Sequence, residues 1–420
     1  MVSRRAALAW ALYDWGNSAF ATVVMAGFFP LFLRDFWSAG EASGTVTFRL
    51  GLVNAAASLL ILATAPLLGA VADRAGARKR FLAGLALLGV AATAALAWIP
   101  AGGWPLALGA YLLATLGFMG ANVFYDALLQ AVCAPREYDR VSSLGFALGY
   151  LGGGLLFAGC AYLALHPQRL GLPDRAAAVR LAFTLTAAWW LVFTLPLLGF
   201  VPEARGPRGA LHAWRAGWRQ LADTFAHLRR YRPLLQFLLA YWLYIDGVDT
   251  IVRMAVDFGR AIGLEPGDLM RALLVTQFVG FPAALAYGRL GERWGTRPAL
   301  LAGIAAYGGI TLWAMQVRQA GDFLVLAVLV GLVQGGVQAL SRSLYARLVP
   351  PERAAEFFGF YNMLGKFAAL LGPLLVGLTA YATGDPRRSL VSLLVLFATG
   401  GGLLARLKLP PAGRGGGAVE

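Results

Sequence analysis

Charged and amide side chains occur at several points inside stretches of this chain that are otherwise apolar. An ionised group near the middle of a lipid bilayer is costly unless it is paired or hydrated, so each such residue is a candidate for function. A carboxylate in that position can accept a proton or bind a cation, and a lysine or arginine can bind an anion. The candidates are Asp14, Asn17, Asp246, Asp249, Arg253, Asn362 and Lys366.

Two pairs of these residues have the same spacing in different parts of the chain. Asp14 and Asn17 are three residues apart, and so are Asp246 and Asp249. Residues at this spacing share one face of an α-helix. At about 1.5 Å per residue, the three carboxyl groups would lie between the inner third and the middle of a bilayer. Two interpretations stay open: the groups contact a solute or a proton in a central cavity, or they form salt bridges that hold helices together.

Basic and aromatic side chains accompany these positions. Arg253 follows Asp249 by four residues, which allows an ion pair within one helix as the alternative to substrate contact. Lys366 is one of only three lysines in the chain, and it can bind a solute carboxylate or pair with an acid on another helix. We expect Tyr13 and Tyr361, which neighbour the polar positions, to line the same cavity.

A short string with the spacing Gly-x3-acid-Arg-x-Gly-x-Arg occurs twice, each time between two apolar stretches. Its members are Gly69, Asp73, Arg74, Gly76 and Arg78, and then Gly288, Glu292, Arg293, Gly295 and Arg297. Such an internal repeat indicates two related halves. The first acid can stabilise a helix N-terminus or pair with an arginine. We therefore expect the ten residues to form a cytoplasmic latch, with a role in topology alone as the alternative.

The elements that must position these residues are membrane helices. The chain has 420 residues, of which 59% are hydrophobic and 14% charged, too apolar for a soluble protein of this size. Apolar runs of roughly 20 residues, the length that crosses a bilayer, recur along the chain. We predict about twelve spans, near 7–33, 49–71, 82–99, 105–131, 142–164, 181–200, 234–256, 270–288, 299–316, 323–345, 357–381 and 389–405.

The net charge of +15 is concentrated in alternate loops, which indicates orientation rather than nucleic-acid binding. This distribution predicts that both termini are cytoplasmic. Arg342 counts among the basic residues expected at the inner face. Asp126, late in the fourth span, is expected close to that face, where water can solvate it.

Other classes of function lack a signal in the sequence. The chain has no nucleophile–base motif, no metal-ligand spacing and no phosphate loop, so we expect no enzyme, no metal and no cofactor. Cys133 and Cys160 are expected to be small buried side chains. The expected partners are a small-molecule solute and the lipid bilayer, with a proton as coupling ion and a monomer as assembly.

The chain divides into an N-terminal six-helix bundle (1–200), a linker (201–233) and a C-terminal six-helix bundle (234–420). Within the linker, apolar residues recur at steps of three and four, which predicts an amphipathic helix on the inner membrane surface. Glycines at short intervals in the fifth and eleventh spans favour close helix packing in lipid.

The repeated string resembles the signature of the loop between helices two and three in the major facilitator superfamily. The segments Ala11 to Ala19, Asp249 to Ala255 and Ala339 to Phe367 are similar to its vacuole-effluxer-like branch. The resemblance implies an all-α integral membrane fold of two pseudo-symmetric bundles that open alternately to each side. Fungal members of the branch are associated with amino-acid efflux from the vacuole.

Together these observations predict a permease for a small polar solute, with an amino acid as the best expectation, in a bacterial cytoplasmic membrane. The alternative is an exporter of amphipathic drugs or lipids in which the buried charges are structural. Proton-coupled drug exporters carry an arginine in the fourth helix and a Gly-Pro motif late in the fifth. Here the fourth span has no arginine and the fifth no proline, which argues against that type of antiport.

Overall fold

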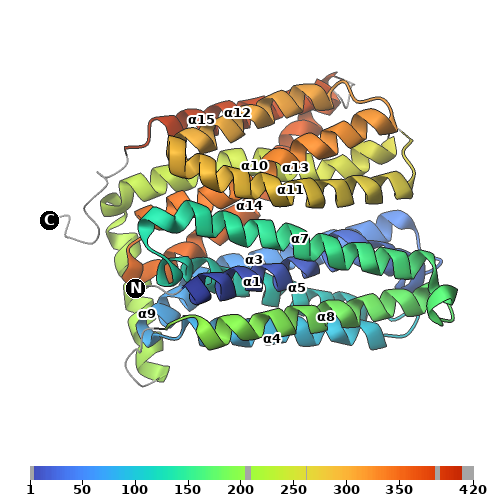
Figure 1. Cartoon of the computed structure of the whole chain (residues 1–420), viewed down its shortest axis with the longest axis horizontal. Coiled ribbons are helices and arrows are strands. Elements are labelled where there is room, and N and C mark those ends of the chain that lie inside the picture. Colours follow the sequence, from blue (N-terminus) through green and yellow to red (C-terminus); the bar gives the residue numbers. More distant parts are fainter. Residues whose placement is uncertain (1–3, 204–209, 262, 384–387, 409–420) are drawn as a thin grey trace.

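The computed structural model describes residues 4–203, 210–261, 263–383 and 388–408 and shows no β-strand among them. The side chains of some helical residues inside these ranges, including Arg253 and Lys366, lie outside the description. Long helices run side by side along one axis, and α9 (Ala210–Ala226) crosses one end of the bundle (Figure 1). The prediction of an all-α fold is confirmed.

The first half of the chain forms one group of helices. These are α1 (Arg4–Ala19), α2 (Phe29–Phe32), α3 (Ser43–Ala75), α4 (Arg78–Ala95), α5 (Trp104–Ala127), α6 (Leu129–Val132), α7 (Tyr138–Leu165) and α8 (Arg175–Phe200). A π-helical stretch, Phe20–Phe28, joins α1 to α2, so that the first helical segment continues to Trp37.

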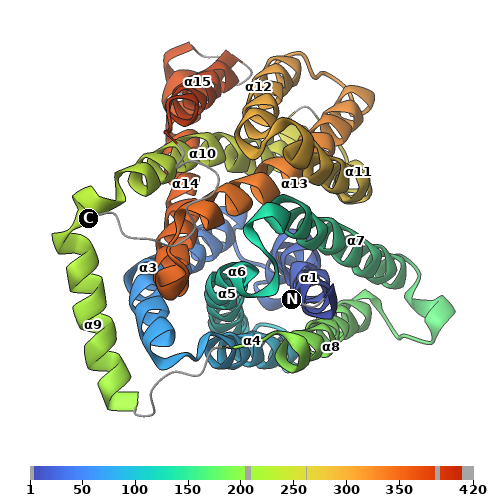
Figure 2. The same cartoon turned by 60° about the vertical axis from the view of Figure 1, so that its left-hand side comes forward.

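The second half forms a second group, which lies beside the first in Figure 1. Its helices are α10 (Arg232–Ala261), α11 (Pro266–Trp294), α12 (Thr296–Ala314), α13 (Ala320–Leu348), α14 (Ala354–Thr383) and α15 (Ser392–Ala405). The two groups meet where α14 packs against α3 and where α11 packs against α7 (Figure 2). The exact boundaries 200 and 233 stay a prediction.

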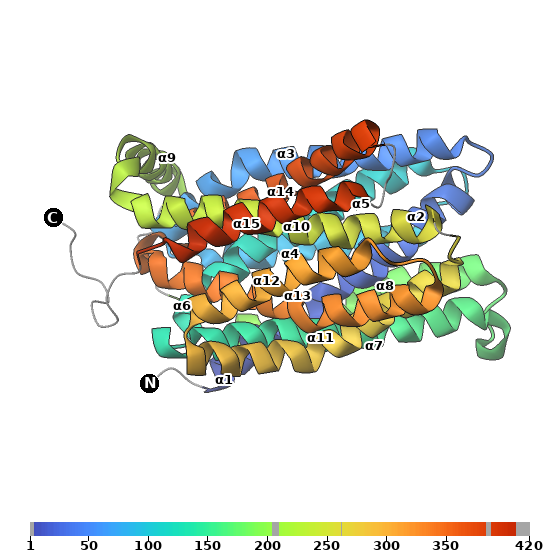
Figure 3. The same cartoon turned by 90° about the horizontal axis from the view of Figure 1, so that it is seen from above.

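Nine helices in the described part of the chain are long and apolar enough to cross a membrane. The last helix is apolar but shorter, over Ser389–Ala405. An integral membrane protein is thus supported, while the count of about twelve spans stays a prediction for α12, α14 and α15. The described residues nearest to both chain ends lie at the end of the bundle that holds α9, here called the α9 end (Figure 3).

Close helix approach at glycines positions α1 against α7. A Cβ on Gly149 would come 2.6 Å from the Ser18 hydroxyl and 3.1 Å from the Asp14 carboxylate. A Cβ on Gly152 would come 2.5 Å from the backbone carbonyl of Trp15. Contacts this short leave no room for a side chain, so the glycines of α7 bring Asp14 to the surface of its neighbour.

Candidate functional site

The centre of the candidate site is the guanidinium of Arg342, on α13. This side chain is only 2% exposed. Its Nη1 lies 3.0 Å from Oδ1 of Asp126 on α5. Its other nitrogens donate to Ser142 on α7, Nε to the hydroxyl at 2.9 Å and Nη2 to the carbonyl at 2.8 Å. An arginine with this many partners is held in one orientation inside the protein.

Asp14 completes the cluster from α1. Its Oδ2 lies 3.9 Å from Nη1 of Arg342, which is farther than the Asp126 contact. Ser18 donates to Asp14 at 2.9 Å, and Tyr125 donates to it at 3.2 Å. One cation therefore faces two carboxyl groups, and the three side chains come from both groups of helices.

Asn362 on α14 adds a second connection between the two groups of helices. Its side-chain nitrogen donates to Oδ2 of Asp126 at 2.9 Å and to the Phe358 carbonyl at 3.1 Å. Asp126 is thus held by α13 and α14 at once. The expectation that water solvates Asp126 near the inner face is wrong, because its side chain is 10% exposed and paired with Arg342.

Aromatic rings surround the cluster. The Arg342 guanidinium lies 4.7 Å from the ring centre of Trp10 and 4.4 Å from that of Phe146. Such cation–π contacts favour a positive charge away from water. A Cβ on Gly145 would come 3.1 Å from Nη2 of Arg342 and 2.7 Å from the Tyr125 hydroxyl. The glycine therefore makes space on α7 for both groups.

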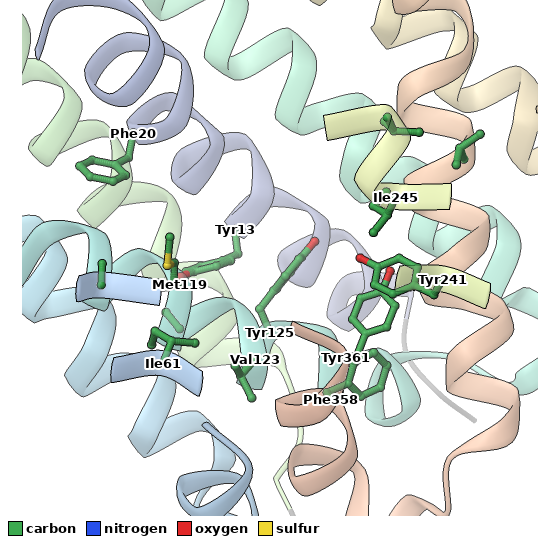
Figure 4. Close-up of a cluster of buried hydrophobic side chains, with 14 of the residues drawn as sticks. Tyr13, Phe20, Ile61, Met119, Val123, Tyr125, Tyr241, Ile245, Phe358 and Tyr361 are labelled. Atoms are coloured by element: carbon green, nitrogen blue, oxygen red, sulfur yellow. The ribbon is translucent and has the colours of Figure 1, made fainter. Parts of the chain in front are cut away.

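Tyrosines from both groups of helices face one another beside the charges (Figure 4). Tyr13 and Tyr125 have ring centres 5.0 Å apart on one side. Tyr241 and Tyr361 stack at 4.2 Å on the other, and Tyr361 is 6% exposed. Tyr13 and Tyr361 thus each pack against rings of their own group of helices, and the shared cavity that they are expected to line stays a prediction.

One helical turn beyond the charges, an amide pair joins α1 to α5. Asn17 donates from Nδ2 to Oδ1 of Asn122 at 2.6 Å. Asn17 is 2% exposed, and its own carbonyl oxygen has no hydrogen-bond partner among the described residues. A buried acceptor without a hydrogen-bond partner costs free energy. Asn17 therefore leaves one unsatisfied acceptor oxygen beside the charged cluster.

Asp246 has a different environment from Asp14. Its carboxylate accepts hydrogen bonds from the backbone nitrogens of Leu371 and Gly372 on α14, at 3.1 and 2.9 Å. Pro373 follows directly, and a proline inside a helix disturbs the hydrogen bonds of the preceding turn. Asp246 thus binds backbone nitrogens of α14 directly before its internal proline. Asp249 lies half-buried one turn further along α10.

Two basic candidates, Arg253 and Lys366, have side chains outside the described part of the chain. Their backbones lie on α10 and α14. Their expected contacts with a solute carboxylate, and the ion pair between Arg253 and Asp249, therefore stay predictions.

The first copy of the repeated string joins the two groups of helices at the α9 end. The Asp73 carboxylate accepts from the backbone nitrogens of Ala355 and Glu356 at 3.1 and 2.9 Å, which belong to the first turn of α14. Arg78 lies 2.6 Å from Asp73 and donates to the Pro351 carbonyl at 2.7 Å. Asp73 therefore binds a helix N-terminus and an arginine at the same time.

The glycines of this copy have backbone roles. A Cβ on Gly69 would overlap the carbonyl of Ala355, so α3 and α14 approach at this point. Gly76 ends α3 with a left-handed φ of 57°, and the Ala77 nitrogen then donates to the Ala72 carbonyl at 3.0 Å. This is the Schellman arrangement that glycine favours after a helix.

The second copy does not repeat these contacts. Glu292 is exposed, with no hydrogen-bond or ion-pair partner in the described ranges. At this place Asp139 of α7 instead binds Thr296 at 2.7 Å, Arg347 at 3.0 Å and the Ser343 hydroxyl. Arg297 donates to the Leu407 carbonyl, near the end of α15, at 2.6 Å.

The remaining members of the two copies have lesser contacts. Arg74 and Arg293 are exposed, and Gly295 has a φ of 89° directly before α12. A Cβ on Gly288 would come 2.9 Å from Ser143 of α7, so this glycine permits close approach between α11 and α7. The polar contacts that the two copies make between the groups of helices therefore come from the first copy, and the second copy contributes the close approach at Gly288.

Sequence reasoning missed Arg342 as a site residue, because it was counted among the basic residues of the inner face. The structure extends α13 to Leu348, so that Arg342 lies well inside the helix end. The serines on both sides of it were a usable signal, since a polar run interrupts an otherwise apolar helix there. Asp139, the partner of Arg347, was also missed.

The comparisons with known proteins agree with this geometry. Residues 48–137 and 130–414 match the model of a family described as vacuole effluxer Atg22 like. An uncharacterized MFS-type transporter of Bacillus subtilis, YxiO, is 41% identical over 94% of this chain and 93% of its own length. Autophagy-related protein 22 of Yarrowia lipolytica is 29% identical over 64% of this chain and 50% of its own length.

Solved structures share the fold at low sequence identity. The human organic anion transporter MFSD10 has a TM-score of 0.71 at 18% identity and covers 96% of this chain and 99% of its own. The proton:xylose symporter XylE has a TM-score of 0.69 at 14% identity and covers 96% of this chain and 94% of its own. These likenesses show the two-bundle architecture and nothing about the solute.

Proposed function

Because this chain belongs to the vacuole effluxer Atg22-like branch of the major facilitator superfamily and is an MFS-type transporter, we propose that it moves a small polar solute, an amino acid by preference, coupled to protons. The observation that supports this most is the Arg342–Asp126–Asp14 cluster between the two groups of helices. In an alternating-access protein, the site must be shared by the halves that move against each other.

The cluster has the chemistry to bind a zwitterion. Arg342 can form two parallel hydrogen bonds to a carboxylate, which a solute can supply in place of Asp126. Asp14 approaches the same guanidinium nitrogen as Asp126 at a longer distance and can receive an ammonium group. The Asn17 carbonyl oxygen, one turn away, offers a further acceptor. These complementary groups suit an amino acid better than an amphipathic drug.

The charge balance of the cluster supports proton coupling. One guanidinium and two ionised carboxylates leave one negative charge inside the protein, which is costly away from water. A proton on Asp14 or a solute ammonium removes that charge. Asp14 is the better proton acceptor of the two, since Asp126 lies 3.0 Å from Arg342 and Asp14 lies 3.9 Å from it. Solute and proton thus act on one cluster.

The contacts at the α9 end favour a conformation closed on that side. Asp73 binds the start of α14, and Asp139 joins α7 to α12 and α13. We propose that the α9 end is cytoplasmic, as the charge distribution predicts, and that opening inward requires these contacts to break.

Transport by purified protein in liposomes tests the proposal. Radiolabelled amino acids are offered with and without a pH gradient to the parent and to D14N. We expect D14N to lose gradient-driven uptake by at least about tenfold, a loss of roughly 1.4 kcal/mol or more. Solute exchange without a gradient should fall as well, because the same carboxylate is proposed to receive the solute ammonium and the proton.

The matched control is D35N, which changes an exposed carboxylate in the same helical segment. It should transport as the parent does. Parental, gradient-dependent transport by D14N would contradict the role of Asp14. Transport of a lipophilic dye by D14N, with no amino acid transported by the parent, would favour the drug or lipid exporter instead.

A further inference from the structure

A cavity of about 410 Å³ lies at the α9 end, between α9, the end of α3 and the turn before α14. Arg74 of α3, Arg215 and Arg219 of α9, and Arg353 before α14 line it. The volume lies in the range of small-molecule sites. No residue of the Arg342 cluster lines this cavity, so the proposed transport site does not account for it.

The charges that line this cavity do not balance. Its one carboxylate, Asp223, lies 2.8 Å from Arg353 and 3.0 Å from His227. The Arg353 guanidinium donates a hydrogen bond to that carboxylate and lowers the pKa of Asp223. Arg74, Arg215 and Arg219 are exposed and have no acidic partner among the described residues. Like charges brought together in this way attract an anion.

The faces of α9 show from which side an anion can enter. Gly217 faces α3, since its Cβ would come 2.6 Å from Val71, and Thr224 on the same face binds Glu356 of α14. Trp214 and Trp218 are exposed, 41% and 58%, on a second face that suits a lipid surface. Arg215, Arg219 and Asp223 of the cavity lie on a third face. Successive residues of an α-helix are rotated by about 100°, so this face points in a different direction from the tryptophans.

We propose that this cavity binds the phosphate group of a soluble cytoplasmic molecule and that the bound ligand stabilises closure of the α9 end. The four arginines supply planar donors that match phosphate oxygens. They come from the first half, the linker and the second half, so one anion contacts three parts that separate when this end opens. A ligand that binds only the closed arrangement shifts the population toward it.

Calorimetry on the full chain in phosphatidylcholine nanodiscs tests the binding, with inorganic pyrophosphate as the probe. We expect the parent to bind pyrophosphate and R215Q/R219Q to bind it at least about tenfold more weakly, since each arginine donates charge-assisted hydrogen bonds. The control R136Q/R289Q removes two arginines outside the cavity and should bind as the parent does.

A native thiol reports on closure in the same samples. Cys133 is buried where the first half meets α13. On one side of it in the chain, Gln130 donates a hydrogen bond to α13, and on the other side the Pro135 carbonyl accepts one from α13. Saturating pyrophosphate should slow the reaction of Cys133 with a maleimide in the parent and leave the rate unchanged in R215Q/R219Q. Because neither readout depends on transport, the result stands apart from the transport assay.

Three outcomes would overturn the inference. The first is no pyrophosphate binding by the parent, and the second is equal binding by R215Q/R219Q, which would mean a merely solvated basic surface. In the third, phosphatidylglycerol in the nanodisc slows Cys133 labelling through Arg215 and Arg219 while pyrophosphate has no effect. The site would then take a lipid headgroup, and the assignment to a soluble molecule would be wrong.

Discussion

At the scale of single residues, the molecule concentrates its chemistry on one arginine. The nitrogens of Arg342 donate hydrogen bonds to Asp126 and Ser142, and the Asp14 carboxylate lies farther away, at 3.9 Å. Removing one partner of a buried ion pair leaves the other charge without compensation, whereas removing both is better tolerated. This difference separates a structural role of the pair from a role in transport.

We expect R342Q to lower the free energy of unfolding by about 3–5 kcal/mol, because it leaves two buried carboxylates without a cation. D126N should cost less, because Asp14 can still pair with Arg342. The double variant R342Q/D126N leaves one carboxylate fewer than R342Q, so it should be more stable than R342Q and still fail to transport. Thermal unfolding and liposome transport, measured on the same preparations, check this. A double variant that regains both stability and transport would show that the pair is structural only.

At the scale of elements, glycines decide how closely helices approach. Gly69 allows α3 to touch the start of α14, which is the contact that Asp73 then stabilises. On α14, Gly372 lies against Thr250 of α10, and Asp246 binds the backbone beside it. Helix α14 is therefore held at its start by α3 and beside its internal proline by α10.

We expect G69A and G84A to shift thermal stability in opposite directions. The added methyl group of G69A overlaps the Ala355 carbonyl and should cost about 1–3 kcal/mol in the closed conformation. Gly84 lies within α4, and no atom comes within 4 Å of the place that an added methyl group would take. Alanine there should therefore stabilise the helix by up to about 1 kcal/mol. Equal melting temperatures for the two variants would refute the close-approach argument.

At the scale of the whole molecule, the two halves are related but do not use equivalent contacts. Asp73 binds the start of α14, whereas its counterpart Glu292 is exposed and Asp139 acts at that place instead. The α9 end is thus closed by different residues on its two sides. Cys133 lies beside the second of these contacts, where burial raises the pKa of its thiol to about 12.

Opening of the α9 end should activate Cys133. The thiolate is the reactive form, so a thiol with a pKa of about 12 reacts slowly near neutral pH and faster once water reaches it and the pKa falls. We expect D73N to label with a maleimide several times faster than the parent, with a rate that rises with pH. Mass spectrometry of the labelled protein measures it.

Two internal controls accompany this experiment. C133S should abolish the labelling, and Cys160, which is fully buried in α7, should stay unlabelled in both proteins. Equal labelling rates for D73N and the parent would mean that Asp73 does not hold the closed conformation.

Hydropathy and the repeated string were sufficient to predict the all-α membrane fold and the family. The length of an apolar run and the presence of a repeated string depend on residues that are neighbours along the chain, so both can be recognised without a structure. The same holds for Gly76, whose conformation follows from its place after a helix, and for Asp14, which is polar in an apolar helix. The functions of Asp14 and Lys366 remain predictions.

The partners of each charge were decided only by the tertiary structure. Arg342 and Asp126 are separated by more than two hundred residues, so no local pattern could show that they meet. Nor could the repeat reveal that Asp139 replaces Glu292, because helix packing selects which polar group fills a contact. The cost of an unpaired charge in lipid makes each buried ionisable residue conspicuous in the sequence, but what satisfies it depends on helices that meet only after folding.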